Sequence, residues 1–98
     1  MDIKKTLNGN DMVVALEGRL DSAAAPGLDA SLAENLQSVD SMVLDLEKVE
    51  YISSAGLRSL LTAHKALAGK GGLKIRNANE IVKEVFDVTG FSDILTIE

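Results

Sequence analysis

Two adjacent serines, Ser53 and Ser54, are the residues of this 98-residue chain whose type and position could do chemistry. An apolar segment precedes them, and an amphipathic segment that starts with Ala55, Gly56 and Leu57 follows them. A helix that begins there would hold a serine hydroxyl at the positive end of its dipole. Such a hydroxyl can cap the helix, act as a nucleophile or accept a phosphate, and the function depends on which of these it does.

The small residues around the pair favour a role beyond capping. One serine is enough to accept a hydrogen bond from a free amide at a helix start, and two are present. Gly56 has no side chain, so we expect it to let the backbone of a partner approach closely. Ala55 is small as well, and the hydroxyls are therefore expected to be open to solvent.

Catalysis by Ser54 is not favoured, and we expect a chain without enzyme activity. A nucleophilic serine needs a base within hydrogen-bond reach. The single histidine, His64, lies ten positions along the same expected helix, which is roughly 15 Å at ~1.5 Å per residue. It falls on or beside the apolar stripe, which is typical of a packed histidine. The serine loop also lacks the glycines and the lysine of a Walker nucleotide site, and residues 69–72 are expected to form a helix C-cap and turn.

Composition argues against several further classes. Asp21, Asp45 and Glu47 show neither metal-ligand nor acid–base spacing, and cysteine is absent, so we expect no metal and no cofactor. Asp21 is expected in a turn or cap, and Asp45 to reach the sheet edge or the serine loop. The net charge of −5 disfavours nucleic acid and anionic membranes. Neither a secretory signal nor an apolar run of about 18 residues is visible, so we expect a cytoplasmic protein without direct membrane insertion.

The first part of the chain predicts an antiparallel hairpin. Asn8-Gly9-Asn10 separates two extended segments, residues 2–7 and 11–18, and Asn-Gly between such segments is a strong hairpin signal. Residues 18–21 are then expected to turn the chain. The length suits a single domain over residues 1–98.

The remainder alternates amphipathic and apolar segments. In order, these predict a helix from Pro26 to about Ser38 with Asp21 or Ser22 near its free amides, a strand over 42–46, a helix from the serines to Ala68, a strand over 73–76, a helix from Asn79 to Gly90, and a short strand or irregular tail over 93–98. Strands that alternate with helices favour parallel pairing. The sequence therefore predicts an α/β fold: a mixed, largely parallel sheet, opened by an N-terminal β-hairpin and covered by three or four helices.

Three motifs resemble those of STAS domains, which include the bacterial anti-sigma factor antagonists and the cytoplasmic modules of sulfate transporters. They are Gly18-Arg19-Leu20-Asp21, Leu44-Asp45-Leu46 and Tyr51-Ile52-Ser53-Ser54-Ala55-Gly56-Leu57. The resemblance covers nearly the whole chain. In the antagonists the loop usually reads Asp-Ser-Ser/Thr-Gly-Leu, and the first serine after the aspartate is phosphorylated by an anti-sigma factor that is also a serine kinase.

The resemblance implies a phosphorylation site and a set of partners. Ser54 falls at the position of the phosphorylated serine, whereas Ser53 replaces the usual aspartate and becomes a rival acceptor. The implied partners are an anti-sigma factor serine kinase and a metal-dependent serine phosphatase. The residues implied to bind the partner are Asp21, Ser22, Ser53, Ser54, Ala55, Gly56, Leu57 and Arg58.

A second interpretation stays open at this point. Because Ser53 departs from the antagonist pattern, the chain could instead be a non-phosphorylated STAS subunit of a transport or lipid-trafficking complex. The membrane part of such a complex would be a separate polypeptide.

Overall fold

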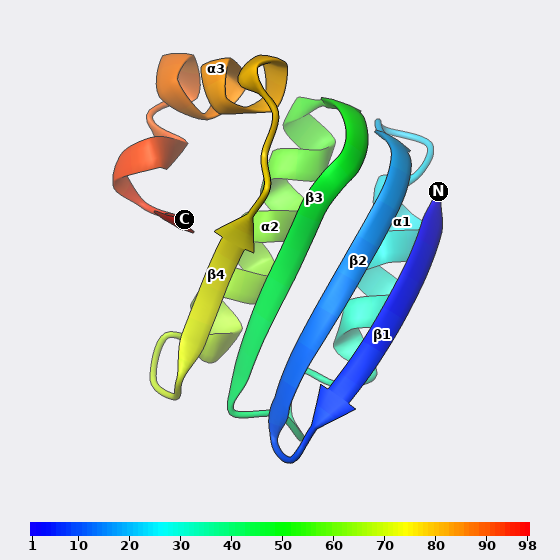
Figure 1. Cartoon of the computed structure of the whole chain (residues 1–98), viewed down its shortest axis with the longest axis vertical. Helices are drawn as coiled ribbons and strands as arrows, with labels where there is room; N and C mark the ends of the chain where they lie inside the picture. Colours follow the sequence, from blue (N-terminus) through cyan, green and yellow to red (C-terminus); the bar gives the residue numbers. More distant parts are fainter.

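A five-stranded sheet forms the centre of the computed structural model, which describes residues 1–98 (Figure 1). The strands lie in the sheet in the order in which they occur along the chain. They are β1 (Asp2–Asn8), β2 (Asp11–Leu20), β3 (Ser41–Ile52), β4 (Gly72–Arg76) and β5 (Thr96–Ile97). β1 is antiparallel to β2, and every other pairing is parallel. The mixed, largely parallel sheet with an N-terminal hairpin is therefore confirmed.

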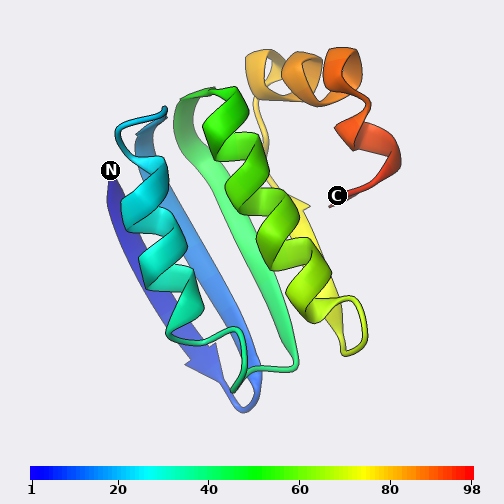
Figure 2. The same ribbon diagram turned by 180° about the vertical axis from the view of Figure 1, so that it is seen from behind.

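Three α-helices accompany the sheet, and they do not share one face equally. They are α1 (Ala25–Ala33), α2 (Ser54–Leu67) and α3 (Glu80–Thr89), and a short 3-10 helix, η1 (Phe91–Asp93), follows. Figure 2 shows α1 and α2 side by side across one face, whereas α3 lies beyond the ends of β3 and β4. The opposite face of the sheet carries no helix (Figure 1). The crossovers through α1 and α2 thus both return over the same face, which brings the starts of these two helices to one end of the molecule.

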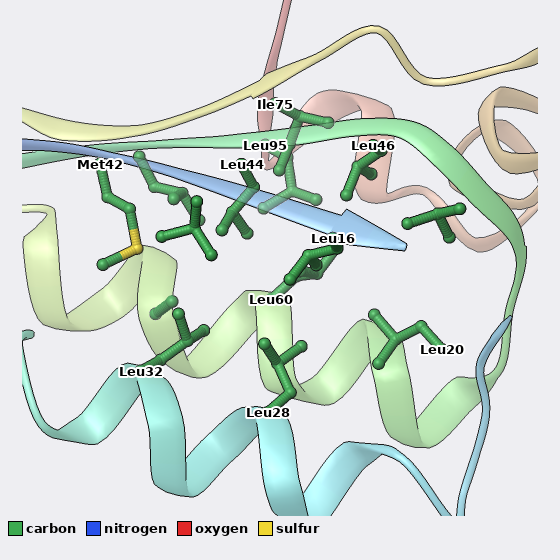
Figure 3. Packing of buried hydrophobic residues seen from close by; sticks show 14 of the residues in the cluster. Leu16, Leu20, Leu28, Leu32, Met42, Leu44, Leu46, Leu60, Ile75 and Leu95 are labelled. Atoms are coloured by element: carbon green, nitrogen blue, oxygen red, sulfur yellow. The ribbon is translucent and has the colours of Figure 1, made fainter. Parts of the chain in front are cut away.

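The core between the sheet and the helices is aliphatic. Leu16 and Leu44 from the sheet meet Leu28 of α1 and Leu60 of α2, and all four are buried (Figure 3). They belong to one cluster of 22 buried residues. At about 1.5–3 kcal/mol for each fully buried aliphatic side chain, this cluster is the main reason the two helices stay on the sheet.

Strands β2 and β3 are longer than the sequence predicts. We expected a turn at residues 18–21 and a strand over 42–46 only. Instead, Leu20 and Ile52 continue the buried side of the two strands and pair with each other. Two register shifts interrupt the β2–β3 pairing, and Gly18 adopts φ +115° beside the second of them. These irregularities hide the alternation in the sequence, and the longer β3 delivers the chain directly to the serines.

Helix α1 is shorter than predicted. It ends at Ala33, whereas the leucine spacing predicts a helix that continues to about Ser38. Turns follow the helix, and the Lys70 ammonium donates to the carbonyl oxygens of Leu36, Gln37 and Val39 at 3.2–3.3 Å. The ammonium thus supplies a donor to backbone carbonyl oxygens of the turn region that follows the helix. Lys70 is therefore a structural residue, in agreement with the turn predicted over residues 69–72.

Candidate functional site

The two serines occupy the junction between β3 and α2. β3 ends at Ile52 and α2 begins at Ser54, so Ser53 is the only residue between them. The backbone N–H of Ser53 donates to the carbonyl oxygen of Leu20 at 2.9 Å. This hydrogen bond fastens the start of α2 to the end of β2, and the turn that follows Leu20 lies against the serine junction.

Ser53 is the N-cap of α2. Its backbone is extended, with φ −96° and ψ 174°, and its hydroxyl oxygen accepts a hydrogen bond from the Gly56 N–H at 3.2 Å. Its carbonyl oxygen accepts from the Leu57 N–H at 2.9 Å. The side chain is half-buried. The Ser53 hydroxyl is therefore already engaged in holding the helix start.

Ser54 is the first residue of α2, and its side chain is exposed. Its hydroxyl takes no part in the hydrogen bonds of the structure, and the cap is made by the neighbouring serine. The first turn of α2 contains no acidic residue. A free hydroxyl thus lies at the positive end of a 14-residue helix, where an added negative charge is favourable.

Two of the residues expected to contact a partner are buried, which corrects that part of the interpretation. Leu57 is 4 % exposed and belongs to the core. A Cβ on Gly56 would lie 2.7 Å from Leu20 Cγ, 2.8 Å from Leu20 O and 3.0 Å from Ile52 Cγ1. Gly56 therefore gives close approach to β2 and β3 of its own chain, and it does not open space for a partner.

The other residues of the expected site lie at the same end of the molecule. Asp21 accepts a hydrogen bond on Oδ1 from the Ala24 N–H at 2.9 Å, so it orders the start of α1. Ser22 is exposed and takes no part in that cap. Ala55 is half-buried, and Arg58 is exposed one turn after Ser54 on α2. On a helix, residues four apart are neighbours on one face, so Arg58 shares the face of Ser54.

Arg19 and Tyr51 were not predicted as site residues, although they lie at this end as well. They are in register on β2 and β3, and the Arg19 guanidinium carbon lies 4.7 Å from the centroid of the Tyr51 ring. Both side chains are exposed. The register shift between Gly18 and Arg19 decides this pairing, and no local sequence signal indicates it.

The remaining polar candidates lie away from the serine junction. His64 is half-buried, and its Nδ1 is buried without a hydrogen-bond partner. Asp45 is paired in the sheet with Ala15 and Arg76 and does not reach the serines. No group of three or more His, Cys, Asp or Glu side chains is arranged to hold a metal ion. None of the helices combines the length and the hydropathy that crossing a membrane requires.

The Asp45 carboxylate is held by three donors. The Glu47 backbone N–H and Asn77 Nδ2 each donate to Oδ1 at 3.1 Å, and Arg76 Nη2 lies 3.7 Å from Oδ2. Burial raises the pKa of this carboxyl, but the donors favour its charged form and outweigh burial. The pKa of Asp45 therefore lies below its ordinary value.

A stability difference that depends on pH is expected for Asp45→Asn. A carboxyl with a lowered pKa in the folded state stabilises the fold above its ordinary pKa, and this contribution is lost as the pH falls through the folded value. The wild type should exceed the variant by up to about 1 kcal/mol at pH 7, because the ion pair with Arg76 is largely solvated. The difference in melting temperature should begin to shrink below about pH 4 and disappear once the pH is below the lowered pKa of Asp45. A gap that stays constant from pH 7 to pH 3 would contradict this explanation.

The two serines should differ in their effect on stability. Ser53→Ala removes the N-cap and is expected to cost about 1 kcal/mol, which corresponds to a fall of about 4–8 °C in melting temperature. Ser54→Ala removes an exposed hydroxyl and should stay within about 0.5 kcal/mol of the wild type. Thermal unfolding followed by circular dichroism measures both. Equal losses in the two variants would mean that the capping role is shared.

Comparison with known families supplies the identity of this fold. The model of the STAS domain matches residues 2–98. The chain belongs to the STAS domain family. Its relatives include BtrV of Bordetella bronchiseptica, named a candidate anti-sigma factor antagonist, which is 38% identical over 88 residues, or 88% of this STAS domain and 76% of BtrV. The anti-sigma-B factor antagonist of Bacillus subtilis is 33% identical over 98 residues, or 99% of this STAS domain and 88% of that protein.

Solved STAS structures share the same fold. The structure of SpoIIAA in its unphosphorylated form matches with a TM-score of 0.84 and 19% identity, over 99% of this chain and 88% of SpoIIAA. The phosphorylated form of SpoIIAA, a Bacillus cell fate determinant, matches with a TM-score of 0.76 and 18% identity, over 99% of this chain and 91% of SpoIIAA. At these identities the likeness concerns the arrangement of strands and helices. The STAS fold predicted from the sequence is thereby confirmed.

Proposed function

We propose that this STAS domain is an anti-sigma factor antagonist that binds a serine-kinase anti-sigma factor and is released when Ser54 is phosphorylated. The observation that carries the proposal is the difference between the two serines. Ser53 caps α2 with its hydroxyl, whereas the hydroxyl of Ser54 is exposed and free to react. Relatives that are named as anti-sigma factor antagonists support the same assignment.

Phosphorylation would act as an electrostatic switch. A phosphate on Ser54 adds about −1.5 to −2 charges. The antagonist tolerates this charge, because Ser54 is exposed at the positive end of α2 and Arg58 is on the same helix face. A partner surface packed over Ser54 would have to bury the charge without a matching cation, which is costly. The modification therefore releases the kinase and leaves the fold intact, and a metal-dependent serine phosphatase restores the binding form.

The chain itself acts as a substrate and a binding module in this proposal. Ser54 has no base in reach, since His64 lies well along α2 and is half-buried. The kinase supplies the base, the ATP and the metal, and this chain supplies the hydroxyl. We place this exchange in the cytoplasm, where ATP is available.

The replacement of the usual aspartate by Ser53 is compatible with this function. Serine and aspartate are about equally good N-cap residues, and Ser53 performs the cap here. The replacement therefore preserves the start of α2 and removes one negative charge beside Ser54. The alternative, a STAS subunit that is not phosphorylated, is favoured only by that missing charge, and the following experiment distinguishes the two.

The test uses the kinases of the organism that encodes the chain. Each of its anti-sigma factor serine kinases is purified and incubated with the chain, Mg²⁺ and ATP, and the products are measured by intact mass and peptide fragmentation. The proposal expects one phosphate at Ser54, unchanged acceptance by Ser53→Ala and none by Ser54→Ala. A chain that these kinases neither bind nor phosphorylate would favour the alternative. Phosphorylation at Ser53 would overturn the assignment of the site.

A further inference from the structure

Arg19 and Tyr51 form a cation–π pair on the helix-free face, at the end of the sheet that carries the serines. Arg19 is paired with Tyr51 across β2 and β3, and its guanidinium carbon lies 4.7 Å from the ring centroid. Leu20 follows Arg19 on β2 and Ile52 follows Tyr51 on β3, and both are buried beneath the helices. Because side chains alternate along a strand, Arg19 and Tyr51 must face the opposite side. Tyr51 is 37% exposed, so the pair is accessible.

The N–H groups of the Arg19 guanidinium pair with no acceptor within the chain. The three ion pairs of the structure use Lys5, Lys74 and Arg76, and none of them involves Arg19. A guanidinium over the face of an aromatic ring contacts the ring through its delocalised charge, and its N–H donors remain available to a partner. The stacking also limits the rotamers of Arg19, which lowers the entropy that a partner must remove on binding.

The pair is continuous with the Ser54 site. The Ser53 N–H donates to Leu20 O at 2.9 Å, so the residue after Arg19 touches the residue before Ser54. A stable interface buries about 800 Å² on each partner, a patch roughly 30 Å across. The shortest dimension of this chain is 19 Å. An interface of this size around Ser54 is wider than the chain is thick, and the ends of β2 and β3 that carry Arg19 and Tyr51 adjoin Ser54 through the hydrogen bond between Ser53 and Leu20.

We propose that Arg19 and Tyr51 are a second anchor for the kinase and that Arg19 binds a carboxylate of the kinase in the unphosphorylated complex. This inference rests on the proposed function and extends it to a surface on the other face of the sheet. Tyrosine and arginine are the residue types that most often dominate interface energies. A carboxylate is the planar, anionic acceptor that matches the two parallel N–H groups of a guanidinium. Arg19 then contributes to the choice of one kinase over others.

The test measures the affinity of Arg19 and Tyr51 variants for the kinase that phosphorylates Ser54. Arg19→Gln should weaken binding of the unphosphorylated chain by about 10- to 30-fold. Arg19→Lys should also weaken it, because lysine keeps the charge and loses the planar fork. Tyr51→Leu should weaken binding, and Tyr51→Phe should stay within about threefold, since phenylalanine retains the ring. Lys65→Gln is the matched control: it removes one exposed positive charge in the last turn of α2, far from the site, and should bind as the wild type does.

Melting temperatures distinguish a variant that has lost kinase binding from a variant that has lost folding stability. Each variant should unfold within a few degrees of the wild type, because an exposed cation–π contact is worth about 0.5–1 kcal/mol. Arg19→Gln with wild-type affinity, while Ser54→Asp no longer binds, would overturn this inference alone. The inference would also be overturned if Arg19→Gln left kinase affinity unchanged and lowered the melting temperature of the phosphorylated chain alone, because Arg19 would then hold the phosphate. A wild-type chain that no kinase binds or phosphorylates would overturn the proposed function itself.

Discussion

Ser54→Asp is expected to weaken binding to the kinase by at least about 100-fold, because a buried charge without a partner costs about 3–5 kcal/mol. The fold should tolerate the same substitution. Ser54 is exposed at the first position of α2, whose first turn has no acidic residue. A carboxylate there gains about 0.3–1 kcal/mol from the helix dipole, so the melting temperature should stay the same or rise by a few degrees. Titration calorimetry and thermal unfolding measure the two effects on one sample.

Ser54→Asn is the matched control for charge. Asparagine has nearly the shape of aspartate and is neutral, so it should bind the kinase far better than Ser54→Asp does. If both variants lose binding equally, the contact at Ser54 is sensitive to size, and phosphorylation would act by steric exclusion. If Ser54→Asp unfolds the chain, the hydroxyl of Ser54 has a structural role that its exposure does not indicate.

Local signals predicted the hairpin and α3 well. The hairpin forms as predicted, but its two-residue loop is Gly9-Asn10 and not Asn8-Gly9: Asn8 pairs with Asp11, and Gly9 adopts φ +66° at the first loop position. Asn79 caps α3 by accepting from the Val82 N–H at 2.8 Å, and Gly90 ends the helix at φ +80°. In each case the residues that set the conformation are within a few positions of one another, so the sequence contains the whole signal.

The extent of β3 and the role of Gly56 could not be predicted in this way. Polar residues follow Leu46 and break the apolar pattern, and the strand continues only because β2 supplies a pairing partner with shifted register. The neighbours of Gly56 are Leu20 and Ile52, and they come from two other elements. A glycine required by a turn and a glycine required by packing look alike in a sequence.

Which serine caps α2 and which serine keeps a free hydroxyl depends on the residue at which the helix begins. Capping and phosphate acceptance were both open to Ser53 and Ser54, since either could precede the helix. The structure starts α2 at Ser54, which assigns the cap to Ser53. The start is fixed by long-range contacts, including the hydrogen bond from the Ser53 N–H to Leu20 O. Strand pairing, and not the local motif, therefore determines which hydroxyl is free.

Gly56→Ala is expected to destabilise the fold by about 2 kcal/mol. A Cβ at this position would meet Leu20 O at 2.8 Å, and a backbone atom in a paired strand cannot move aside as a flexible side chain can. Overpacking of this kind costs about 1–3 kcal/mol, and it exceeds the gain of up to about 1 kcal/mol that alanine brings to a helix. The melting temperature should fall by about 8–16 °C. Because α2 would have to move away from β2, affinity for the kinase should fall as well.

Gly27→Ala provides the control of opposite sign. Gly27 is also helical, lies in α1, and has no atom within 4 Å of its ideal Cβ. Alanine there keeps the gain in helix propensity and meets no obstacle, so stability should rise by up to about 1 kcal/mol. Thermal unfolding of the two variants then separates packing from propensity, since the substitution is the same. If Gly56→Ala were as stable as Gly27→Ala, the close approach of α2 to β2 would not be what requires a glycine in the first turn of α2, and kinase binding would be the remaining reason for it.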